Sequence, residues 1–512
     1  MIAQLQSRLA RHALLLAFIA GAILSLAFAP YGVWPLAILC PAYLFFAWQG
    51  ASARHAAAVG FWFSAGTFGA GTYWLYHSIH TIGGAPIWVA LFLMVALVAI
   101  MGLYLALLGY VQARLLPTVG ALRWLVGLPA MWLLLEWWRG WFLSGFPWLS
   151  LGYAQIDSPL AALAPLLGVY GISFACVLCA GALLTLIIGS KRERVLALAA
   201  LLLPWLCAWP LWKHEWTQIA GPPLTVAVVQ GAIPQDEKWS PEWRDKTLAL
   251  YRELAEPHFG ARLIVWPEAA LPDLAHELTD YLSSLWSDAH AKDSDIIMGL
   301  LHYDPQKDAY YNGVLALSDR VEWYHKRHLV PFAEYFPVPS FIRSWLKLMS
   351  LPHSDFDSGA VEQAPLDAAG QKIGTTICYE DGFGAEQLGV LRQATLLVNV
   401  TNDAWFGDTS APHQHLEISR MRALESGRVM IRAANDGISA IIAADGKIQA
   451  TLPRFKAAVL TGTVQPRTGL TPYARMGNWP IIVFSLLCAI AVVARTARQR
   501  ITQRAVVELN QT

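Results

Sequence analysis

Three residue types that together support acyl transfer through a covalent intermediate occur in one hydrophilic stretch of the chain. They are Glu268, Lys326 and Cys378, in that order. A cysteine thiol can act as a nucleophile, a glutamate as its base, and a lysine ammonium can stabilise the oxyanion of a tetrahedral intermediate. A lone glutamate or lysine is usually a solvated surface residue, so the set and its order carry the argument. Because the rest of the chain is membrane-like, the set predicts acyl transfer at a lipid surface.

Cys378 is the only cysteine in residues 222–475, which have an ordinary globular composition. A lone cysteine in an oxidising compartment is either a structural thiol or a reactive one, and the residues around Cys378 favour a reactive thiol. Cys176 and Cys179 form a C-x-x-C inside an apolar run without a histidine or acidic partner, so we interpret them as packing residues. The remaining cysteines also fall in apolar segments: Cys40, Cys207 and Cys488.

The elements that must position the three residues alternate between two patterns. β-branched or apolar runs predict strands at Thr225–Gln230, Leu263–Trp266, Asp295–Leu301, Gly313–Leu317, Ile373–Cys378, Leu396–Val400, Ile438–Ala443 and Val459–Val464. Amphipathic stretches predict helices at Pro241–Leu254, Leu278–His290 and Glu417–Ser426. This alternation predicts an α/β domain with helices packed outside sheets. Asp445-Gly446 predicts a hairpin turn between the last two strands.

Each of the three residues follows a strand-like run. Pro267 should end the strand before Glu268, Lys326 follows the segment Val321–Tyr324, and Cys378 ends its own strand. Catalytic groups at strand ends are common in α/β domains. We therefore expect the three side chains to meet at one edge of the domain.

The remainder of the chain has the composition of a membrane protein. In the whole chain of 512 residues, 56% are hydrophobic and only 14% are charged, whereas soluble proteins carry roughly 25% charged residues. About eight segments supply the roughly 20 apolar residues that a spanning helix needs. They lie near 12–29, 33–49, 57–76, 87–110, 124–142, 160–189, 195–212 and 478–494. We expect seven spanning helices in residues 1–212 and a final one, with a short tail, in 478–512. The net charge of +1 gives no argument for nucleic-acid binding.

The basic residues predict how these helices are oriented. Loops 30–32, 77–86 and 143–159 contain no lysine or arginine, whereas the short loops on the other side and the two ends of the chain contain several. These are Arg8, Arg11, Arg54, Arg114, Arg123, Lys191, Arg192, Arg194, Arg495, Arg498, Arg500 and Arg504. Basic loops stay in the cytoplasm, so an even number of spans places both termini there. The domain 222–465 then faces the periplasm of a bacterium with two membranes.

Two apolar-region features have more than one interpretation. Glu136 and Arg139 lie near the outer end of the fifth span, where charges are costly and often functional. Their i, i+3 spacing favours a structural ion couple.

The apolar segment 335–354 favours a lid at the membrane interface that gates lipid access, and the alternative is a long loop packed on the helices. Its apolar residues are Phe336, Phe341, Trp345, Leu346, Leu348, Met349 and Leu351.

Longer motifs around the three residues resemble the carbon–nitrogen hydrolase (nitrilase) superfamily, whose Glu-Lys-Cys triad occurs in this order. The closest resemblance is to a membrane-bound branch that acylates lipoproteins, and it covers essentially the whole chain. The motifs are Trp266-Pro267-Glu268, Tyr324 to Phe332 with Glu334, Cys378-Tyr379-Glu380, Thr401 to Phe406, and His413 to Glu425. The resemblance implies a four-layer αββα sandwich for residues 222–465 on an eight-helix bundle.

The resemblance also implies the reaction. An acyl chain would leave the sn-1 position of a phospholipid, phosphatidylethanolamine being the expected donor, wait on Cys378 as a thioester, and pass to the N-terminal α-amine of a diacylglyceryl-cysteine in an apolipoprotein. Glu268 is then the base, Lys326 the oxyanion donor and Cys378 the nucleophile. Glu334 would orient Lys326 or assist proton transfer, and the Tyr379 N–H would be a second oxyanion donor. Glu380 would brace the turn that carries the nucleophile, and Trp239 would take part in substrate binding.

Other functions remain as alternatives. A membrane-tethered amidase would use the same triad and release the acyl group to water. A catalytically inactive scaffold conflicts with the intact triad, and a transporter conflicts with the few ionisable residues in the spans. His413 and His415 with Asp403 or Asp408 could bind zinc. The triad needs no metal or other cofactor, however, so we expect none.

Overall fold

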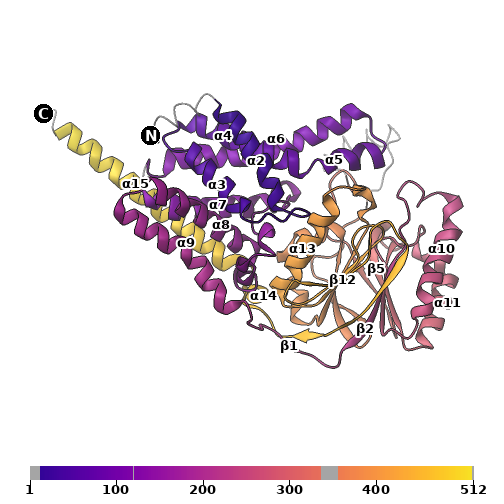
Figure 1. Ribbon diagram of the computed structural model, residues 1–512. Helices are drawn as coiled ribbons and strands as arrows, with labels where there is room; N and C mark the ends of the chain where they lie inside the picture. The colour runs from indigo at the N-terminus through magenta and orange to yellow at the C-terminus, as the bar shows by residue number, and fades with distance from the viewer. Residues whose placement is uncertain (1–11, 119, 336–355, 510–512) are drawn as a thin grey trace. The chain divides into compact units, whose positions relative to one another are not determined.

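The protein is described by a computed structural model that covers residues 12–118, 120–335 and 356–509. Its chain divides into two compact units. One comprises Met1–His214 with Met476–Thr512, and the other Glu215–Arg475. Figure 1 shows that the first is helical and that the second contains the β-strands.

The helical unit has a helix in each of the eight segments that the sequence predicts. They are α2 (Ala13–Leu24), α3 (Leu36–Ala47), α4 (Ala53–Gly71), α6 (Ile87–Leu115), α7 (Leu128–Arg139), α8 (Ala164–Ile188), α9 (Lys191–Leu211) and α15 (Trp479–Leu509). Among the described residues, 4 helices are long and apolar enough to cross a membrane: Ile87–Leu115, Pro159–Ile188, Lys191–Leu211 and Trp479–Glu508. The helical membrane unit is confirmed, whereas the count of eight spans stays a prediction.

The exposed side chains of this unit are those expected in contact with lipid. Trp88 on α6 and Trp209 on α9 are 72% and 80% exposed, which would be unfavourable in water. Inside the unit small residues let helices approach closely. A Cβ added to Gly66 of α4 would lie 2.0 Å from the Phe18 carbonyl oxygen of α2. Any larger residue there would force the two backbones apart.

Glu136 and Arg139 make no salt bridge with each other among the described residues, but their opposite charges interact, as the predicted ion couple requires. Both are buried, and both also bind the segment 146–151. The Arg139 guanidinium donates to the carbonyls of Phe146 and Trp148 at 2.9 and 2.6 Å and to Ser150 Oγ at 2.9 Å. Glu136 Oε1 accepts the Leu151 N–H at 3.1 Å. The pair therefore fastens a non-helical segment to α7 and satisfies backbone groups that would otherwise be buried unpaired.

The second unit contains two six-stranded sheets. One has the order β13 (Ala458–Val464), β2 (Leu224–Gln230), β3 (Leu263–Val265), β4 (Asp295–Asp304), β5 (Ala309–Leu317) and β6 (Val321–His325). The other has the order β12 (Ile448–Thr451), β11 (Ala440–Ile442), β10 (Met430–Ala434), β9 (Leu396–Thr401), β8 (Gln371–Ile377) and β7 (Leu366–Ala368). The runs β2-β3-β4 and β8-β9-β10 are parallel. A short ribbon pairs β1 (Gln218–Ile219) with β14 (Arg467–Thr468).

The sheets are buried on both faces. Val226 and Val228 of β2 pack in a core shared with the second sheet, and Ala227 and Val229 pack in a core shared with helices. This alternation follows from the two-residue period of a strand, and burial on both faces explains why the strands are continuous apolar runs. Helices α10 (Pro241–Ala255) and α11 (Thr279–His290) cover the first sheet, and α13 (Ala411–Ser426) covers the second (Figure 1). The predicted sandwich of sheets between helices is confirmed.

The predicted turn at Asp445-Gly446 joins a different pair of strands from the pair that the sequence indicated. Asp445-Gly446 joins β11 to β12, a strand that the sequence pattern did not predict, and not to β13. β13 instead pairs antiparallel with β2 in the other sheet. The sequence also gave no prediction for β10, which carries the charged and fully buried Arg432.

Candidate active site

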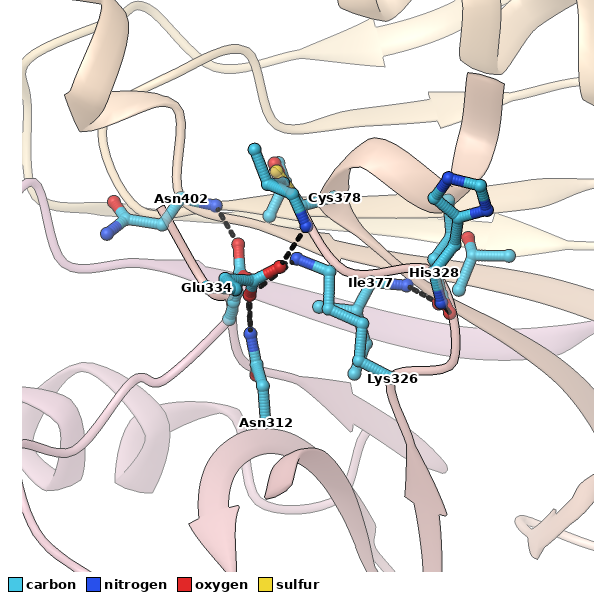
Figure 2. Close-up of polar contacts among 12 residues, drawn as sticks. Asn312, Lys326, His328, Glu334, Ile377, Cys378 and Asn402 are labelled. Atoms are coloured by element: carbon cyan, nitrogen blue, oxygen red, sulfur yellow. Dashed lines mark hydrogen bonds and ion pairs between the residues drawn. The ribbon is translucent and has the colours of Figure 1, made fainter. Parts of the chain in front are cut away.

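The structure brings Glu268, Lys326 and Cys378 together at strand ends of the two sheets; Figure 2 labels the side chains of Lys326 and Cys378. Glu268 lies shortly after β3, Lys326 directly after β6, and Cys378 directly after β8. The first two strands belong to one sheet and the third to the other. Lys326 and Glu268 are only 1% and 7% exposed. The site is therefore a buried group of ionisable residues at the seam between the sheets.

Two carboxylates share the Lys326 ammonium. Lys326 Nζ donates to Glu334 Oε1 at 2.8 Å and to Glu268 Oε1 at 3.4 Å. Burial alone would lower the pKa of Lys326, but Glu334, Glu268 and Cys378 raise it above its usual value. The lysine is therefore an ammonium throughout the physiological range, as an electrostatic stabiliser must be.

Asn312 on β5 joins the same two carboxylates, and the sequence analysis missed it. Its Nδ2 donates to Glu268 Oε1 at 2.7 Å and to Glu334 Oε1 at 3.0 Å. Its backbone carbonyl accepts the backbone N–H of Lys326 at 2.8 Å. Asparagine is uncommon in strand interiors. A lone asparagine in the apolar and aromatic run Ala309–Leu317 was the available signal.

Glu268 is also fixed from its other sides. Its Oε2 accepts the Asn402 N–H at 2.8 Å, and its carbonyl accepts from Lys238 Nζ at 3.3 Å. Burial lowers the pKa of Lys238 to about 8, although Glu268 and Asp436 raise it. With donors on both carboxylate oxygens, Glu268 has a defined orientation before any substrate binds.

Gly299 of β4 makes room for the turn that carries Glu268. A Cβ at Gly299 would lie 2.5 Å from Glu268 Cα and 2.6 Å from the Pro267 carbonyl oxygen. Gly299→Ala is therefore expected to displace Glu268 and to slow formation of a covalent acyl-enzyme by about 10²-fold, the effect of a 1 Å misplacement. Single-turnover acylation measures this loss. Gly389→Ala, where a Cβ meets nothing within 4 Å, is the control, and an equal rate in both variants would contradict the prediction.

Cys378 occupies an uncommon backbone conformation. Its φ is +51°, in the left-handed region that costs a non-glycine residue about 1–3 kcal/mol. Its carbonyl oxygen is 3.0 Å from His415 Nε2. Burial and then Glu268 raise the pKa of the thiol well above its usual value, despite the opposing effect of Lys326. Cys378 therefore rests as a thiol, and it would need a base to remove its proton before it could act as a nucleophile.

Glu380 links the segment after Lys326 to the residue before Cys378. Its Oε1 accepts the N–H groups of Arg327 and His328 at 2.7 and 3.2 Å, and its Oε2 accepts the Ile377 N–H at 2.7 Å. Burial raises the pKa of Glu380 to about 6, although these backbone hydrogen bonds lower it. This geometry is that of a brace between the two strand ends.

Glu380→Gln tests the brace. The glutamine amide presents one oxygen and one NH₂ group, so at least one backbone N–H loses its acceptor. Leaving that buried donor without a hydrogen bond costs about 1–3 kcal/mol. We expect acylation of Cys378 to fall by about 10- to 100-fold, the rate equivalent of that energy. Single-turnover assays with Glu362→Gln, an exposed glutamate, as the control measure the effect. A wild-type rate would show that Glu380 does not position the nucleophile.

Comparison with known proteins covers both units. The family model for the apolipoprotein N-acyltransferase N-terminal domain matches residues 20–182, and the model for carbon–nitrogen hydrolase matches residues 225–473. The apolipoprotein N-acyltransferase of Methylococcus capsulatus is 41% identical over 95% of this chain and 96% of its own. Those of Pseudomonas syringae and Pseudomonas putida are each 42% identical over 92% and 94% of this chain and 95% and 96% of their own.

The chain belongs to the apolipoprotein N-acyltransferase family. Identity of this level across nearly the full length of each relative confirms the resemblance drawn from the motifs. In this member of the family, the motif residues Trp266, Lys326, Cys378 and Asn402 all lie in or next to the buried site.

The two further residues predicted for the site lie at its edges. Trp239 is 48% exposed and follows Lys238, which contacts Glu268. The Tyr379 side chain packs against Phe383 with ring centroids 5.0 Å apart. The segment predicted as a lid lies outside the described residues apart from Tyr335.

The histidine pair considered as a zinc site has another arrangement. Both nitrogens of His415 face oxygens, Asp403 Oδ1 at 3.0 Å and the Cys378 carbonyl at 3.0 Å. Across residues 12–118, 120–335 and 356–509, no group of three or more histidine, cysteine or acidic residues could hold a metal ion. His415 belongs instead to the shell beneath the nucleophile.

Proposed function

We propose that this chain transfers the sn-1 acyl chain of a phospholipid, with phosphatidylethanolamine as the donor, to the N-terminal α-amine of a diacylglyceryl apolipoprotein. The observation that supports this most directly is the close arrangement of Glu268, Lys326 and Cys378 in a chain that is similar to an apolipoprotein N-acyltransferase over 95% of its length. Lipoprotein N-acylation is the activity that the names of these relatives give.

In the first half-reaction Cys378 attacks the ester carbonyl while Glu268 takes the thiol proton. Lys326 then stabilises the tetrahedral oxyanion, to which one preorganised donor contributes about 3–4 kcal/mol. The tetrahedral intermediate collapses as the ester C–O bond breaks, and Glu268 gives its proton to the departing lysophospholipid oxygen. The product is a thioester on Cys378.

In the second half-reaction the acceptor amine attacks the thioester carbonyl. Glu268 takes a proton from the amine nitrogen, the C–S bond breaks, and the proton passes to the Cys378 sulfur. Because the acyl group stays on Cys378 as a thioester between the two half-reactions, the two substrates need not bind together, and the kinetics should be ping-pong. Glu334 and Asn312 orient Lys326 and Glu268 in both halves, Glu380 braces the nucleophile turn, and Trp239 contacts substrate.

The membrane topology is also part of the proposal. Eight spans with both termini in the cytoplasm of a bacterial inner membrane would place the unit that carries Cys378 in the periplasm. The lysine- and arginine-free loops 30–32, 77–86 and 143–159 support this orientation. A cysteine-reactive, membrane-impermeant reagent applied to intact spheroplasts should therefore label Cys378, and labelling that requires lysis of the spheroplasts would contradict this orientation.

The test of the function separates its two halves. Purified protein is incubated with phosphatidylethanolamine alone, and its intact mass and the released lysophospholipid are measured. A diacylglyceryl-cysteine peptide is then added. A fatty-acyl adduct that the peptide discharges, with acylated peptide as the product, is the expected result. Lysophospholipid and free fatty acid without acylated peptide would instead support the membrane-tethered amidase, and no adduct would overturn the proposal.

A further inference from the structure

His415 is a buried residue beneath the nucleophile that no step above uses. It lies on α13 and is 1% exposed. Its Nε2 is 3.0 Å from the Cys378 carbonyl oxygen, and its Nδ1 is 3.0 Å from Asp403 Oδ1. A carbonyl oxygen can only accept a hydrogen bond, so Nε2 is the donor there.

Asp403 is in turn an ionised acceptor. Its Oδ2 accepts from Arg432 Nη2 at 2.9 Å, and its Oδ1 accepts from Thr401 Oγ1 at 3.1 Å. Burial alone would raise the pKa of Asp403, but Arg432 and His415 keep it below its usual range. His415 Nδ1 therefore donates to a carboxylate, and the ring donates from both nitrogens. Arg432, Asp403, His415 and the Cys378 carbonyl form one continuous hydrogen-bonded chain.

This chain determines how the peptide between Cys378 and Tyr379 is oriented. The peptide is trans, since the only cis bond in the described backbone is Ala29-Pro30. In a trans peptide the C=O and the N–H point in opposite directions. With the carbonyl directed at His415, the Tyr379 N–H points away from His415. The left-handed φ of Cys378 makes this orientation costly without such a partner.

We propose that His415 is a positioning residue that fixes the Cys378–Tyr379 peptide so that the Tyr379 N–H donates to the oxyanion of both tetrahedral intermediates. Lys326 then approaches the oxyanion from one sheet and the Tyr379 N–H from the other. Hydrogen bonds in series polarise one another, so the buried charge of Arg432 and Asp403 strengthens the donor as well as orienting it. The inference rests on the proposed acyl-enzyme chemistry.

Two amide variants separate the contacts of His415. Asparagine places its amide nitrogen near the position of Nδ1, so His415→Asn keeps a donor to Asp403 and loses the one to Cys378. Glutamine reaches the position of Nε2, so His415→Gln keeps the donor to the carbonyl. We expect acylation of Cys378 by phosphatidylethanolamine to fall about 10²-fold in His415→Asn, the effect of losing one oxyanion donor. The fall in His415→Gln should be at least tenfold smaller.

Alkylation of Cys378 by iodoacetamide is the second readout, measured on the Cys378 peptide. Displacement of iodide forms no oxyanion, so alkylation should stay within about threefold of wild type in a variant that has lost only the donor. A merely structural defect would lower both rates and the unfolding temperature together. Acylation in His415→Asn at the wild-type rate, or equal loss of acylation in the two variants, would overturn the inference. If the wild-type protein forms no acyl-enzyme, the proposed function fails before His415 is tested.

Discussion

Cys378→Ala is expected to form no acyl-enzyme with phosphatidylethanolamine and to lose transfer to the diacylglyceryl peptide by at least about 10⁴-fold, as removal of a catalytic nucleophile does. The cysteine lies at the end of β8 with both Glu268 and Lys326 acting on its thiol. Alanine keeps the backbone contacts of the turn and removes only the sulfur. The intact mass after lipid incubation measures the effect directly.

A matched control exists in the same chain. Cys207 on α9 is exposed and has no part in the proposed reaction, so Cys207→Ala should form the acyl-enzyme at the wild-type rate. Unfolding temperatures of both variants should equal that of the wild type. An acyl adduct on Cys378→Ala would show that another residue carries the acyl group and would remove Cys378 from the mechanism.

Glu268→Gln has the second largest expected effect. Glutamine keeps the size of the side chain and an oxygen for Asn312 or the Asn402 N–H, but it cannot take the thiol proton. Lys326 keeps Glu334 at 2.8 Å as a counter-charge, so the ammonium should remain in place. We expect both half-reactions to slow by about 10³- to 10⁴-fold, the upper range for general base catalysis. Single-turnover acylation and peptide discharge measure the two halves separately.

The control for this substitution is Glu277→Gln, because Glu277 is exposed and lies on the same inter-strand connection. The rate of Glu268→Gln should still be rising above pH 8.5, the usual pKa of a cysteine, because burial keeps the pKa of the Cys378 thiol higher and solvent hydroxide must take the proton in place of the base. Discharge of the acyl-enzyme at the wild-type rate would restrict Glu268 to the first half-reaction.

The sequence predicted the strands that are buried on both faces, because their apolar runs are unbroken. It missed β10, where Arg432 interrupts the run Met430–Ala434. A charge inside a strand is uncommon, and here Asp403, brought near by tertiary folding, compensates it at 2.9 Å. It also misassigned the partner of β13, since pairing between β13 and β2 depends on contacts far apart in the chain.

The candidate site shows the same division. Glu268, Lys326 and Cys378 could be named in advance because each follows a strand and the three occur in a family order. Asn312 and His415 could not be placed, since each acts through a partner that no local pattern identifies. The spacing of Glu136 and Arg139 indicated that their charges interact, but it did not reveal the carbonyls of residues 146–151 that also bind Arg139.

The pairing of β13 with β2 has a consequence for how the chain is made. β2 begins at Leu224 and its partner ends at Val464, so all of the residues proposed for catalysis leave the ribosome before the first sheet can be completed. Until then β2 presents an unpaired edge, the kind of surface on which chains aggregate. A polypeptide that ended between residues 379 and 457 would carry the whole triad and still lack β13.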